Sequence, residues 1–403
     1  MTSLPLSGVQ VLDFTTFLSG PFATQLLGDL GATVIKVEPA QGDSSRAIPS
    51  HEVGGDSGYY LANNRNKKSV GINLKTERGR SLARELALKC DVVIENFRPG
   101  VAARLGLDST ALRECKPELI WASISGFGQT GPWKDRPAYD MIVQALSGAM
   151  SLTGEPGGNA VRLGVPMGDI AAGLFSVIGI LSALHARKSS GQGTVIDVAM
   201  LDCMLSLLSY QGVYSLISGQ APQPQGARHD SIPTYRSFRA GDGREFVMTA
   251  NTERMWQGVC NAIGQPDLSA DPRYSDGRKR LENRESLWRV LETAFSGETA
   301  RIWVDRLQAN DVPAAVIRNV AEALADARKS GRGMICSVET ADARFDSLGA
   351  PIKFDQAVST PSTYPPAIGE HNVEVLGDLI GLTADEAEQL MAEDVLHAVN
   401  GRG

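Results

Sequence analysis

The sequence predicts an α/β protein: a doubly wound, Rossmann-like parallel sheet with a second, smaller α+β domain. Short apolar runs alternate with helical patterns from Val9 to Val198, which is typical of parallel strands joined by helices. The loops after these runs are rich in Gly, Pro, Asn or Arg, and ligands of such sheets bind beyond the carboxyl ends of the strands. From residue 218 a linker rich in Gln, Pro and Gly leads to a different pattern.

The first domain contains the alternation in full. A polar stretch, 41–69, is expected to form a long surface loop with one helical turn at 59–63. Apolar runs predict strands at 9–14, 33–37, 69–73, 91–95, 119–124 and 194–198. Helical periodicity predicts helices at 21–30, 76–89, 139–150, 170–186 and 199–217, with helical pieces over 101–115.

The second domain begins after the linker at 218–233. Two short strands flank Gly241-Asp242-Gly243, a hairpin turn signal. Helices are expected at 252–263, 281–295 and 300–310, with a strand at 313–317, a β pattern at 336–354 and a last helical region at 372–393. We therefore predict a first domain at 1–220, a small domain at 221–330, and a return to the first domain at 331–403.

The composition of the chain argues against several classes of function. The 403 residues are 42% hydrophobic and 21% charged, with a formal net charge of −7 and no basic cluster, which argues against a nucleic-acid partner. The longest apolar run, Ile170–Leu184, is shorter than the roughly 18 residues of a spanning helix, so no membrane is expected. Five scattered cysteines without CxxC spacing predict no metal site and no disulfide framework, and favour a cytoplasmic location.

Asp169 is the central candidate for chemistry. It follows the tight approach GVPMG and stands at the cap or in the first turn of a long apolar helix, where Asp is favoured because its oxygens accept hydrogen bonds from free backbone N–H groups. Small neighbours, including Gly164, Gly168 and Gly173, would also leave that carboxylate open to a bulky ligand. An open carboxylate can act as a nucleophile toward an activated carbonyl. Capping and nucleophilic catalysis both stand as interpretations of this residue.

Two basic groups are candidates for phosphate binding. The first contains Arg65, Lys67, Lys68 and Lys75, and the second contains Arg98, Arg104, Lys134 and Arg136. Solvated surface charges are the simpler interpretation. Phosphate binding is favoured for Arg98, which lies at a predicted strand end beside Phe97 and could bind phosphate with two hydrogen bonds. No GxGxxG follows the first strand and Ser125 lacks a GxSxG context, which argues against dinucleotide binding and serine hydrolysis.

These segments together resemble the class III CoA-transferases, of the formyl-CoA transferase and carnitine-CoA transferase type (CaiB/BaiF). The resemblance lies in VLDFTTFLSGPFATQLLGDLGATVIKVEP, NRNKKSVGINLKTERG, DVVIENFRPGVAARLG, ISGFGQTGPWKDRPAYDMIVQALSGAMSLTG, GVPMGDIAAG and PPAIGEHN, which cover nearly the whole chain in order. It implies that Asp169 attacks an acyl-CoA thioester to form an aspartyl anhydride. It also implies a homodimer of interlocked rings, with acyl-CoA and a carboxylic acid as substrates and no permanently bound cofactor.

The same resemblance implies a set of CoA contacts. They fall on Phe17, Leu18, Ile72, Asn73, Leu74, Lys75, Asn96, Phe97, Arg98, Arg104, Arg136, Pro137, Ala138 and Tyr139. Gln25 and Tyr139 are further candidates for holding the thioester or the anhydride.

Two features of the sequence indicate the branch of the family that the chain resembles. Racemases of this fold carry a His where Tyr139 stands, and a tyrosine with a pKa near 10 is a poor proton shuttle. The formyl-CoA branch carries a glycine run that GARHDSIPTYRSF lacks, while Arg228, His229 and Arg236 there could meet a second carboxylate. We expect transfer of CoA from succinyl-CoA or another dicarboxyl-CoA to a free acid. A 2-methylacyl-CoA racemase and a non-catalytic CoA-binding protein are the alternatives.

Overall fold

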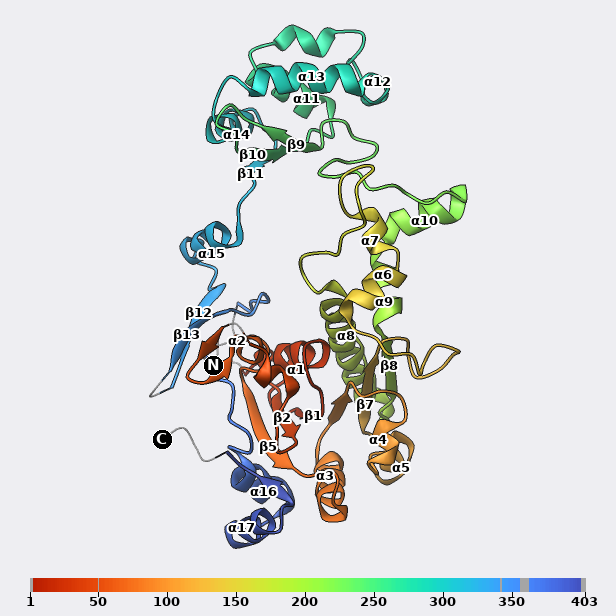
Figure 1. Ribbon diagram of the computed structural model, residues 1–403, viewed down its shortest axis with the longest axis vertical. Coiled ribbons are helices and arrows are strands. Elements are labelled where there is room, and N and C mark those ends of the chain that lie inside the picture. The colour runs from red at the N-terminus through yellow and green to blue at the C-terminus, as the bar shows by residue number, and fades with distance from the viewer. Residues whose placement is uncertain (1–2, 50, 341–342, 356–361, 400–403) are drawn as a thin grey trace. The chain divides into compact units, whose positions relative to one another are not determined.

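The computed structural model describes residues 3–49, 51–340, 343–355 and 362–399, which form two compact units (Figure 1). The first unit comprises Met1–Ala149, Arg162–Gln220 and Ser330–Gly403, and the second comprises Met150–Val161 and Ala221–Lys329. The short segment Met150–Val161, which the sequence places in the first domain, belongs to the second unit because it contacts that unit: the Gly226 amide donates to the Gly154 carbonyl at 2.8 Å.

A seven-stranded sheet in the order β14-β5-β2-β1-β6-β7-β8 forms the centre of the first unit. Six strands are parallel, and the predicted parallel sheet is confirmed. They are β1 (Gln10–Asp13), β2 (Thr33–Glu38), β5 (Lys67–Ile72), β6 (Val92–Glu95), β7 (Ile120–Ser125) and β8 (Val195–Ala199). The edge strand β14 (Leu396–His397) is antiparallel and was not predicted, because two residues carry no readable alternation.

The strand order reverses beside β1. The chain moves outward from β1 to β2 and β5, and then returns to the other side of β1 with β6, β7 and β8. The loops that leave β1 and β6 therefore run in opposite directions, which leaves a crevice at the carboxyl ends of these two strands. Any ligand site built by this sheet is expected there.

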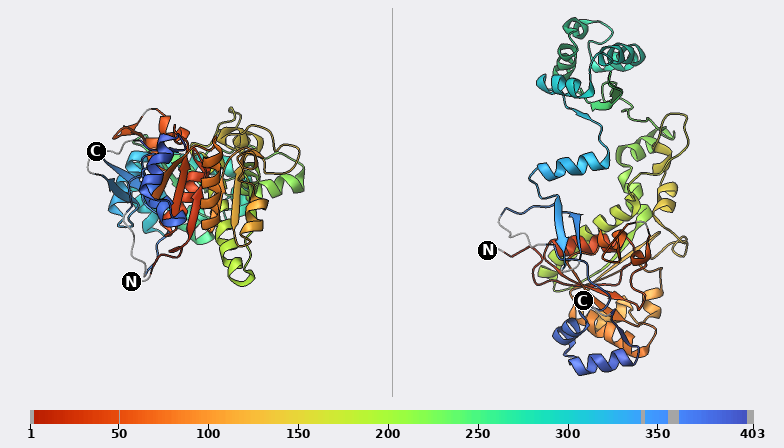
Figure 2. Two further views of the ribbon diagram at one scale, coloured as in Figure 1. Left: turned by 90° about the horizontal axis from the view of Figure 1, so that it is seen from below. Right: turned by 60° about the vertical axis from the view of Figure 1, so that its left-hand side comes forward.

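Helices cover both faces of the sheet, and alternate residues of each strand point into two separate cores. Val11 of β1 packs with α1 (Ser19–Asp29) and α8 (Met167–Ser190). Leu12 faces the opposite core, with α3 (Glu77–Lys89), α5 (Ser109–Cys115), α16 (Asn372–Ile380) and α17 (Ala384–Ala392). Figure 2 shows α1 (red) on one side of the sheet and the C-terminal helices (blue) with α3 (orange) on the other.

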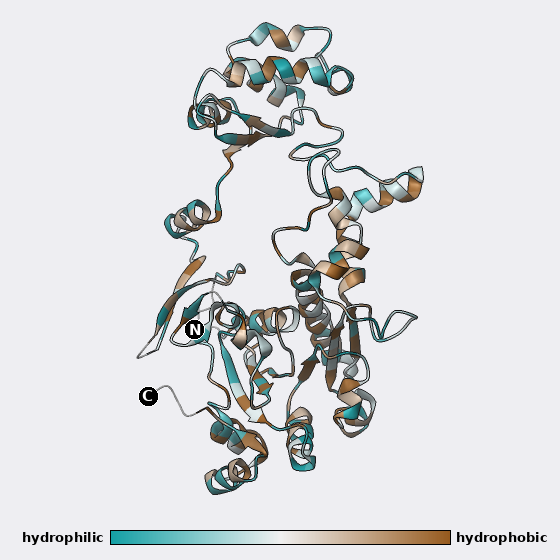
Figure 3. Cartoon of the chain, in the orientation of Figure 1, coloured by the Kyte–Doolittle hydropathy of each residue, from teal (hydrophilic) through white to brown (hydrophobic). Residues whose placement is uncertain are grey.

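Helix α8 is longer than the sequence predicted and extends over 24 residues. Its length and apolar composition match those of a membrane-crossing helix, and half of its most apolar window is buried in the protein. Gly173 allows this burial, since a Cβ there would lie 2.8 Å from the Ser19 carbonyl oxygen of α1. Leu174, Phe175 and Ile178 of α8 are exposed, and Figure 3 shows the hydropathy of each residue along the helix.

Three predicted elements between residues 41 and 217 differ in detail from the structure. The predicted helix at 139–150 is divided at Gly148, which has a φ of +84°, into α6 (Asp140–Leu146) and α7 (Ala149–Leu152). The predicted helix at 199–217 bends by 79° between α9 (Met200–Leu207) and α10 (Ser209–Ser218). The long loop contains η1 (Ser44–Ala47), β3 (Glu52–Val53), β4 (Asp56–Ser57) and α2 (Gly58–Leu61), the last close to the expected helical turn.

The remaining elements complete the two units. The first unit also contains α4 (Val101–Arg104) and the antiparallel pair β12 (Ile335–Glu339) and β13 (Arg344–Leu348). The second unit has an antiparallel sheet of β9 (Arg236–Arg239), β10 (Glu245–Met248) and β11 (Ala314–Val316). Its helices are α11 (Glu253–Ala262), η2 (Pro266–Ala270), α12 (Gly277–Glu282), α13 (Arg284–Phe295), α14 (Ala300–Ala309) and the unpredicted α15 (Val320–Lys329). Phe295 packs edge-on against Phe238 and Phe246 in its core.

Candidate active site

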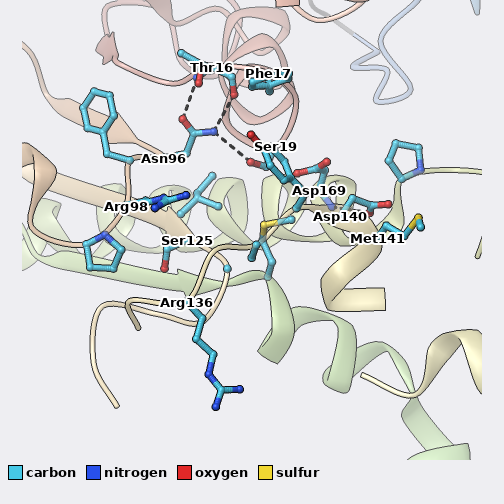
Figure 4. A pocket seen from close by; sticks show the side chains of 18 of the residues that line it. Thr16, Phe17, Ser19, Asn96, Arg98, Ser125, Arg136, Asp140, Met141 and Asp169 are labelled. Atoms are coloured by element: carbon cyan, nitrogen blue, oxygen red, sulfur yellow. Dashed lines mark hydrogen bonds between the residues drawn. The ribbon is translucent and has the colours of Figure 1, made fainter. Parts of the chain in front are cut away.

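A cavity of about 650 Å³ opens where the strand order reverses (Figure 4). The loops after β1, β6 and β7 form one side of it, and the first turns of α6 and α8 form the other. The loops contribute Thr16, Phe17, Asn96, Phe97, Arg98, Ser125 and Gly126, and the helix starts contribute Ser19 of α1 together with Tyr139, Asp140, Pro166 and Asp169. The cavity therefore lies at the crevice that the sheet topology predicts.

Buried ion pairs shape the turn after β1. The Lys36 ammonium lies 2.8 Å from the Asp43 carboxylate and donates to the Thr15 carbonyl at 2.6 Å. Asp43 in turn accepts a hydrogen bond from the Phe17 amide at 3.1 Å. Phe17 has a φ of +66°, an uncommon conformation for an aromatic residue, and its ring meets the Tyr139 ring edge-on at 6.0 Å. The buried charges thus fix the backbone that presents Phe17 to the cavity.

The turn after β6 is tied to the turn after β1 through one amide. Asn96 Oδ1 accepts from the Thr16 amide at 2.9 Å, and Asn96 Nδ2 donates to the Thr16 carbonyl at 2.8 Å. The same Nδ2 lies 3.5 Å from Ser19 Oγ. Below this turn, Glu95 accepts from the Phe97 amide at 2.7 Å, and burial raises the pKa of Glu95 to about 7. These hydrogen bonds therefore fix the backbone of the loops after β1 and β6.

Asp140 holds the start of α8. Its Oδ1 accepts from the Gly168 amide at 2.8 Å and more weakly from the Asp169 amide at 3.4 Å. Its Oδ2 accepts from Gln144 at 2.7 Å, and Gln144 Oε1 accepts from the Leu163 amide at 2.9 Å. Gly168 is required at this contact, since a Cβ would lie 2.6 Å from Val143. Asp140 thus caps α8 from a neighbouring helix.

Asp169 is left free of the capping role. Asp169 lies in the first turn of α8, as the sequence allowed, and not at the cap position, which is occupied by Pro166 without a side-chain capping bond. Burial raises the pKa of Asp169 to about 7, and the charge of Asp140 raises it further in the same direction, while a hydrogen bond from Ser19 opposes both. Among the described residues, no Lys or Arg contributes to this pKa. The result is a basic, partly buried carboxylate that faces a cavity.

Three members of the first basic group form ion pairs within the protein. Arg65 pairs with Asp29 at 2.6 Å, Lys67 with Asp13 at 3.2 Å, and Lys68 with Glu374 at 2.6 Å. Arg65 and Lys67 are buried, so phosphate binding and solvation are both wrong for these two side chains. In the second group Arg98, Lys134 and Arg136 line the cavity, and the Arg136 guanidinium lies 4.6 Å from the centre of the Trp133 ring.

The structure brings together part of the predicted CoA-contact set. The residues of that set that line the cavity with Asp169 are Phe17, Asn96, Phe97, Arg98, Arg136, Ala138 and Tyr139. Those that lie outside this cavity are Leu18, Ile72, Asn73, Leu74, Lys75, Arg104 and Pro137. Ile72 is fully buried and exposes no surface to a ligand in this structure. CoA contact at these outer positions stays a prediction.

Two further groups of candidates lie elsewhere. Gln25 is buried in α1, where its Oε1 accepts from the Arg65 amide at 3.3 Å, and it does not line the cavity. In the second unit Arg236 pairs with Glu292 at 3.1 Å and stacks on Trp288 at 4.6 Å. The Arg228 guanidinium lies 5.3 Å from the same ring, and His229 stacks on Tyr235. These contacts within the second unit account for the positions of the three side chains without a bound ligand.

Sequence reasoning missed several residues of the site. Ser19, Tyr59, Arg162 and Met200 line the cavity, and the link from Asp140 to the Asp169 amide spans 29 positions. The small-residue loop was the available signal for Arg162, since it stands two positions before Gly164. In the part of the chain that the structure describes, no group of three or more His, Cys, Asp or Glu side chains could hold a metal ion.

Comparison with known proteins gives a consistent result. The model of the family described as CoA-transferase family III matches residues 6–372. The chain is 35% identical to the human succinyl-CoA:glutarate CoA-transferase over 93% of this chain and 86% of that one. It is 38% identical to the succinate–glutarate CoA-transferase of Agrobacterium fabrum, over 93% and 96%. The crystal structure of a CaiB/BaiF family protein from Brucella suis has a TM-score of 0.83 and 36% identity, over 94% of this chain and 100% of that one.

Proposed function

Because this chain belongs to CoA-transferase family III and is a CoA-transferase, we propose that it moves CoA between dicarboxylic acids, with Asp169 as the covalent nucleophile. One observation carries the assignment of the nucleophile. Asp169 is a carboxylate with a pKa raised to about 7, and it faces a cavity at the carboxyl ends of the strands. A basic carboxylate is a better nucleophile than an ordinary one, and at neutral pH it is ionised in part.

The proposed reaction proceeds in four balanced steps. The Asp169 carboxylate attacks the thioester carbonyl, the C–S bond breaks, and CoA thiolate leaves an aspartyl anhydride. The thiolate then attacks the aspartyl carbonyl, which releases the first acid as its carboxylate and leaves an aspartyl–CoA thioester. The acceptor carboxylate attacks that thioester and forms a second anhydride with release of thiolate. The thiolate finally attacks the acyl carbonyl, which yields the new CoA ester and regenerates Asp169. No proton, oxidant or metal is needed.

Dicarboxylic substrates are supported by the relatives. The two relatives named above act on succinyl-CoA or succinate and on glutarate, and a further relative, 36% identical over 93% of this chain, is the succinyl-CoA:mesaconate CoA-transferase of Haloarcula hispanica. Succinyl-CoA is therefore the proposed donor, with a dicarboxylate of four or five carbons as the proposed acceptor. Cytoplasmic location stays part of the proposal; all five cysteines are free thiols in the structure.

We further propose that the protein is an interlocked homodimer. Helices α8 and α10 of the first unit expose many large apolar side chains, and large exposed apolar areas on soluble proteins mark interaction sites. Leu216 and Ile217 are 86% and 80% exposed. The other exposed apolar side chains of these helices are Leu174, Phe175, Ile178, Leu181, Tyr210, Val213 and Tyr214. Light scattering should give twice the mass of the 43.0 kDa chain.

One mass-spectrometric experiment tests the transfer. The protein is incubated in D₂O with succinyl-CoA, a 2-methylacyl-CoA and a panel of mono- and dicarboxylic acids, and the CoA esters are weighed. We expect new CoA esters of dicarboxylic acids and no deuterium in the 2-methylacyl-CoA. Deuterium gain without a new ester would favour the racemase and contradict the proposal, and no change in any ester would contradict turnover on these donors.

A further inference from the structure

We infer that Arg162 determines the preference for dicarboxylic substrates, by binding the carboxylate at the far end of the acyl chain that Asp169 carries. This inference rests on the proposed function and assigns one of its substrate contacts to a residue. Arg162 is neither part of the predicted CoA-contact set nor part of the chemistry at Asp169.

The backbone places Arg162 in a fixed relation to Asp169. Both residues line the same cavity, and the segment between them leads directly into α8. The neighbouring Leu163 amide donates to Gln144, which is bonded to Asp140, and Asp140 accepts from the first amides of α8. One buried pair of side chains, Gln144 and Asp140, thus anchors both ends of the segment. The backbone next to Arg162 is therefore bonded to the same pair of side chains as the start of α8.

Two carboxylates, those of Asp140 and Asp169, lie where α6 and α8 border the cavity, and a cation there would favour binding of a dicarboxylate. Asp140 and Asp169 are carboxylates, and in the described parts of the chain neither has a Lys or Arg partner. An incoming dicarboxylate brings two more negative charges, and the one that does not react would be repelled. A guanidinium offers a planar pair of donors that matches a carboxylate.

Arg162 meets the two conditions for that role. Its side chain is exposed to the cavity, and no ion pair to it occurs among the described residues. It also does not lower the pKa of Asp169, so it stands apart from the nucleophile and leaves that carboxylate basic. A cation at the nucleophile would weaken it, whereas a cation elsewhere on the wall of the same cavity can bind the distal carboxylate.

The other cations of the cavity are on different walls. Arg98 follows β6, whereas Lys134 and Arg136 belong to the loop after β7. Figure 4 shows Arg136 directed away from Asp169 and Arg98 on the side of the β6 turn. Their places suit the phosphates of CoA, as the resemblance implies. Arg162 is the cation on the wall that leads into α8.

The test compares acceptors that differ only at the distal group. Glutarate and valerate have equal chain lengths, and only glutarate has a second carboxylate. With succinyl-CoA as donor, kcat/KM is measured for both acceptors in the wild type, Arg162→Gln, Arg162→Lys and the exposed control Arg332→Gln. We expect Arg162→Gln to lower kcat/KM for glutarate about 10- to 100-fold relative to valerate, the loss of a charge-assisted pair of hydrogen bonds. Arg162→Lys, which keeps the charge without the planar fork, should give an intermediate loss.

A second donor separates acyl recognition from CoA recognition. Butyryl-CoA and succinyl-CoA share the CoA moiety, so Arg162→Gln should raise KM for succinyl-CoA and leave KM for butyryl-CoA near its wild-type value. Equal losses with both donors would assign Arg162 to CoA itself and overturn the inference while transfer stands. Equal losses for both acceptors would also overturn it. Absence of any new CoA ester with the wild type would instead overturn the proposed function, and this inference with it.

Discussion

Buried carboxylates lie on both sides of the turn after β1, in opposite electrostatic settings. On one side is a paired network of Asp13, Lys36, Asp43 and Lys67, all essentially inaccessible to solvent. On the other side is a carboxylate pair, Asp140 and Asp169, without a cation among the described residues. Both groups lie beside the turn after β1, but only the first group contains lysines that compensate the negative charge of its carboxylates.

The pKa values follow that difference. Burial acts to raise the pKa of Asp43, but Lys36 and several hydrogen bonds outweigh it and bring the pKa to about 2. In Asp13, Lys67 and Lys36 likewise outweigh burial, and the pKa falls below its usual value. Burial also acts on Asp169, where Asp140 adds to it and the pKa rises to about 7. The carboxylates that are paired with lysines therefore stabilise the turn after β1. The unpaired Asp169 keeps a raised pKa, which suits a reactive carboxylate.

Replacing Asp169 should have the largest effect on function. Asp169→Asn keeps the shape and removes the nucleophile, so transfer should fall by at least about 10³-fold, while CoA affinity stays within about threefold. Transfer is followed by mass spectrometry and CoA affinity by calorimetry. Asp202→Asn, which changes an exposed aspartate in the first turn of α9, is the matched control. Retention of most of the turnover would disprove the nucleophile.

The same variant also tests the electrostatic cost of Asp169. A carboxyl whose folded pKa is raised stabilises the fold below the unfolded pKa of about 4, and loses that stabilisation as the pH rises through about 7. Asp169→Asn has no such loss. Its free energy of unfolding should therefore exceed that of the wild type by up to about 4 kcal/mol at pH 8, with the gap closing toward pH 4.

Replacing Asp13 should have the largest effect on stability. Asp13→Asn leaves the Lys36 and Lys67 ammonium groups buried without that carboxylate, and unpaired buried charge costs about 3–5 kcal/mol of unfolding free energy. Urea unfolding measures this loss. Asp311→Asn breaks the exposed pair with Arg254 and should cost less than about 1 kcal/mol. Similar losses in the two variants would mean that the network contributes no more than surface pairs.

The strands, the helix α8 and the site residues that depend on neighbouring residues in the chain could be predicted from the sequence. Apolar alternation located the six parallel strands, and a long apolar run after a small-residue loop located α8 and Asp169. Loop composition pointed to Asn96 and Arg98, which line the cavity. These signals work because neighbouring residues in a strand or helix share one environment.

The partners of these residues could not be predicted, because they are distant in the chain. Lys36 and Lys67 occupy strand positions where a lysine looks like a solvated residue, and only the pairing of β2 with β1 and β5 buries them beside Asp13. Asp140 resembles an ordinary first-turn aspartate of α6. Its bonds to α8 exist because α6 packs on that helix, a contact that no local pattern encodes.

Removing the charge of Asp140 should shift the pH dependence. The wild-type rate should rise with pH to a midpoint near 7, as Asp169 ionises. Asp140→Asn retains an oxygen for the Gly168 amide and removes the repulsion, so the midpoint should fall by about 1 unit. Asp197→Asn, whose carboxylate acts on Glu95, is the control and should not move it. An unmoved midpoint in Asp140→Asn would contradict the role of this charge.

Removing the Ser19 hydroxyl should give the smallest effect, with the opposite sign. Ser19 donates to the ionised form of Asp169 and lowers its pKa, and Asn96 Nδ2 lies 3.5 Å from the same hydroxyl. Ser19→Ala should therefore raise the midpoint by about half a unit and reduce the rate at pH 6 about threefold, with little change at pH 9. Ser176→Ala removes a buried α8 hydroxyl that bonds the Ala172 carbonyl and should leave the midpoint in place. Opposite shifts in Asp140→Asn and Ser19→Ala would show that the Asp169 pKa is set by the groups around it, because burial alone has one sign.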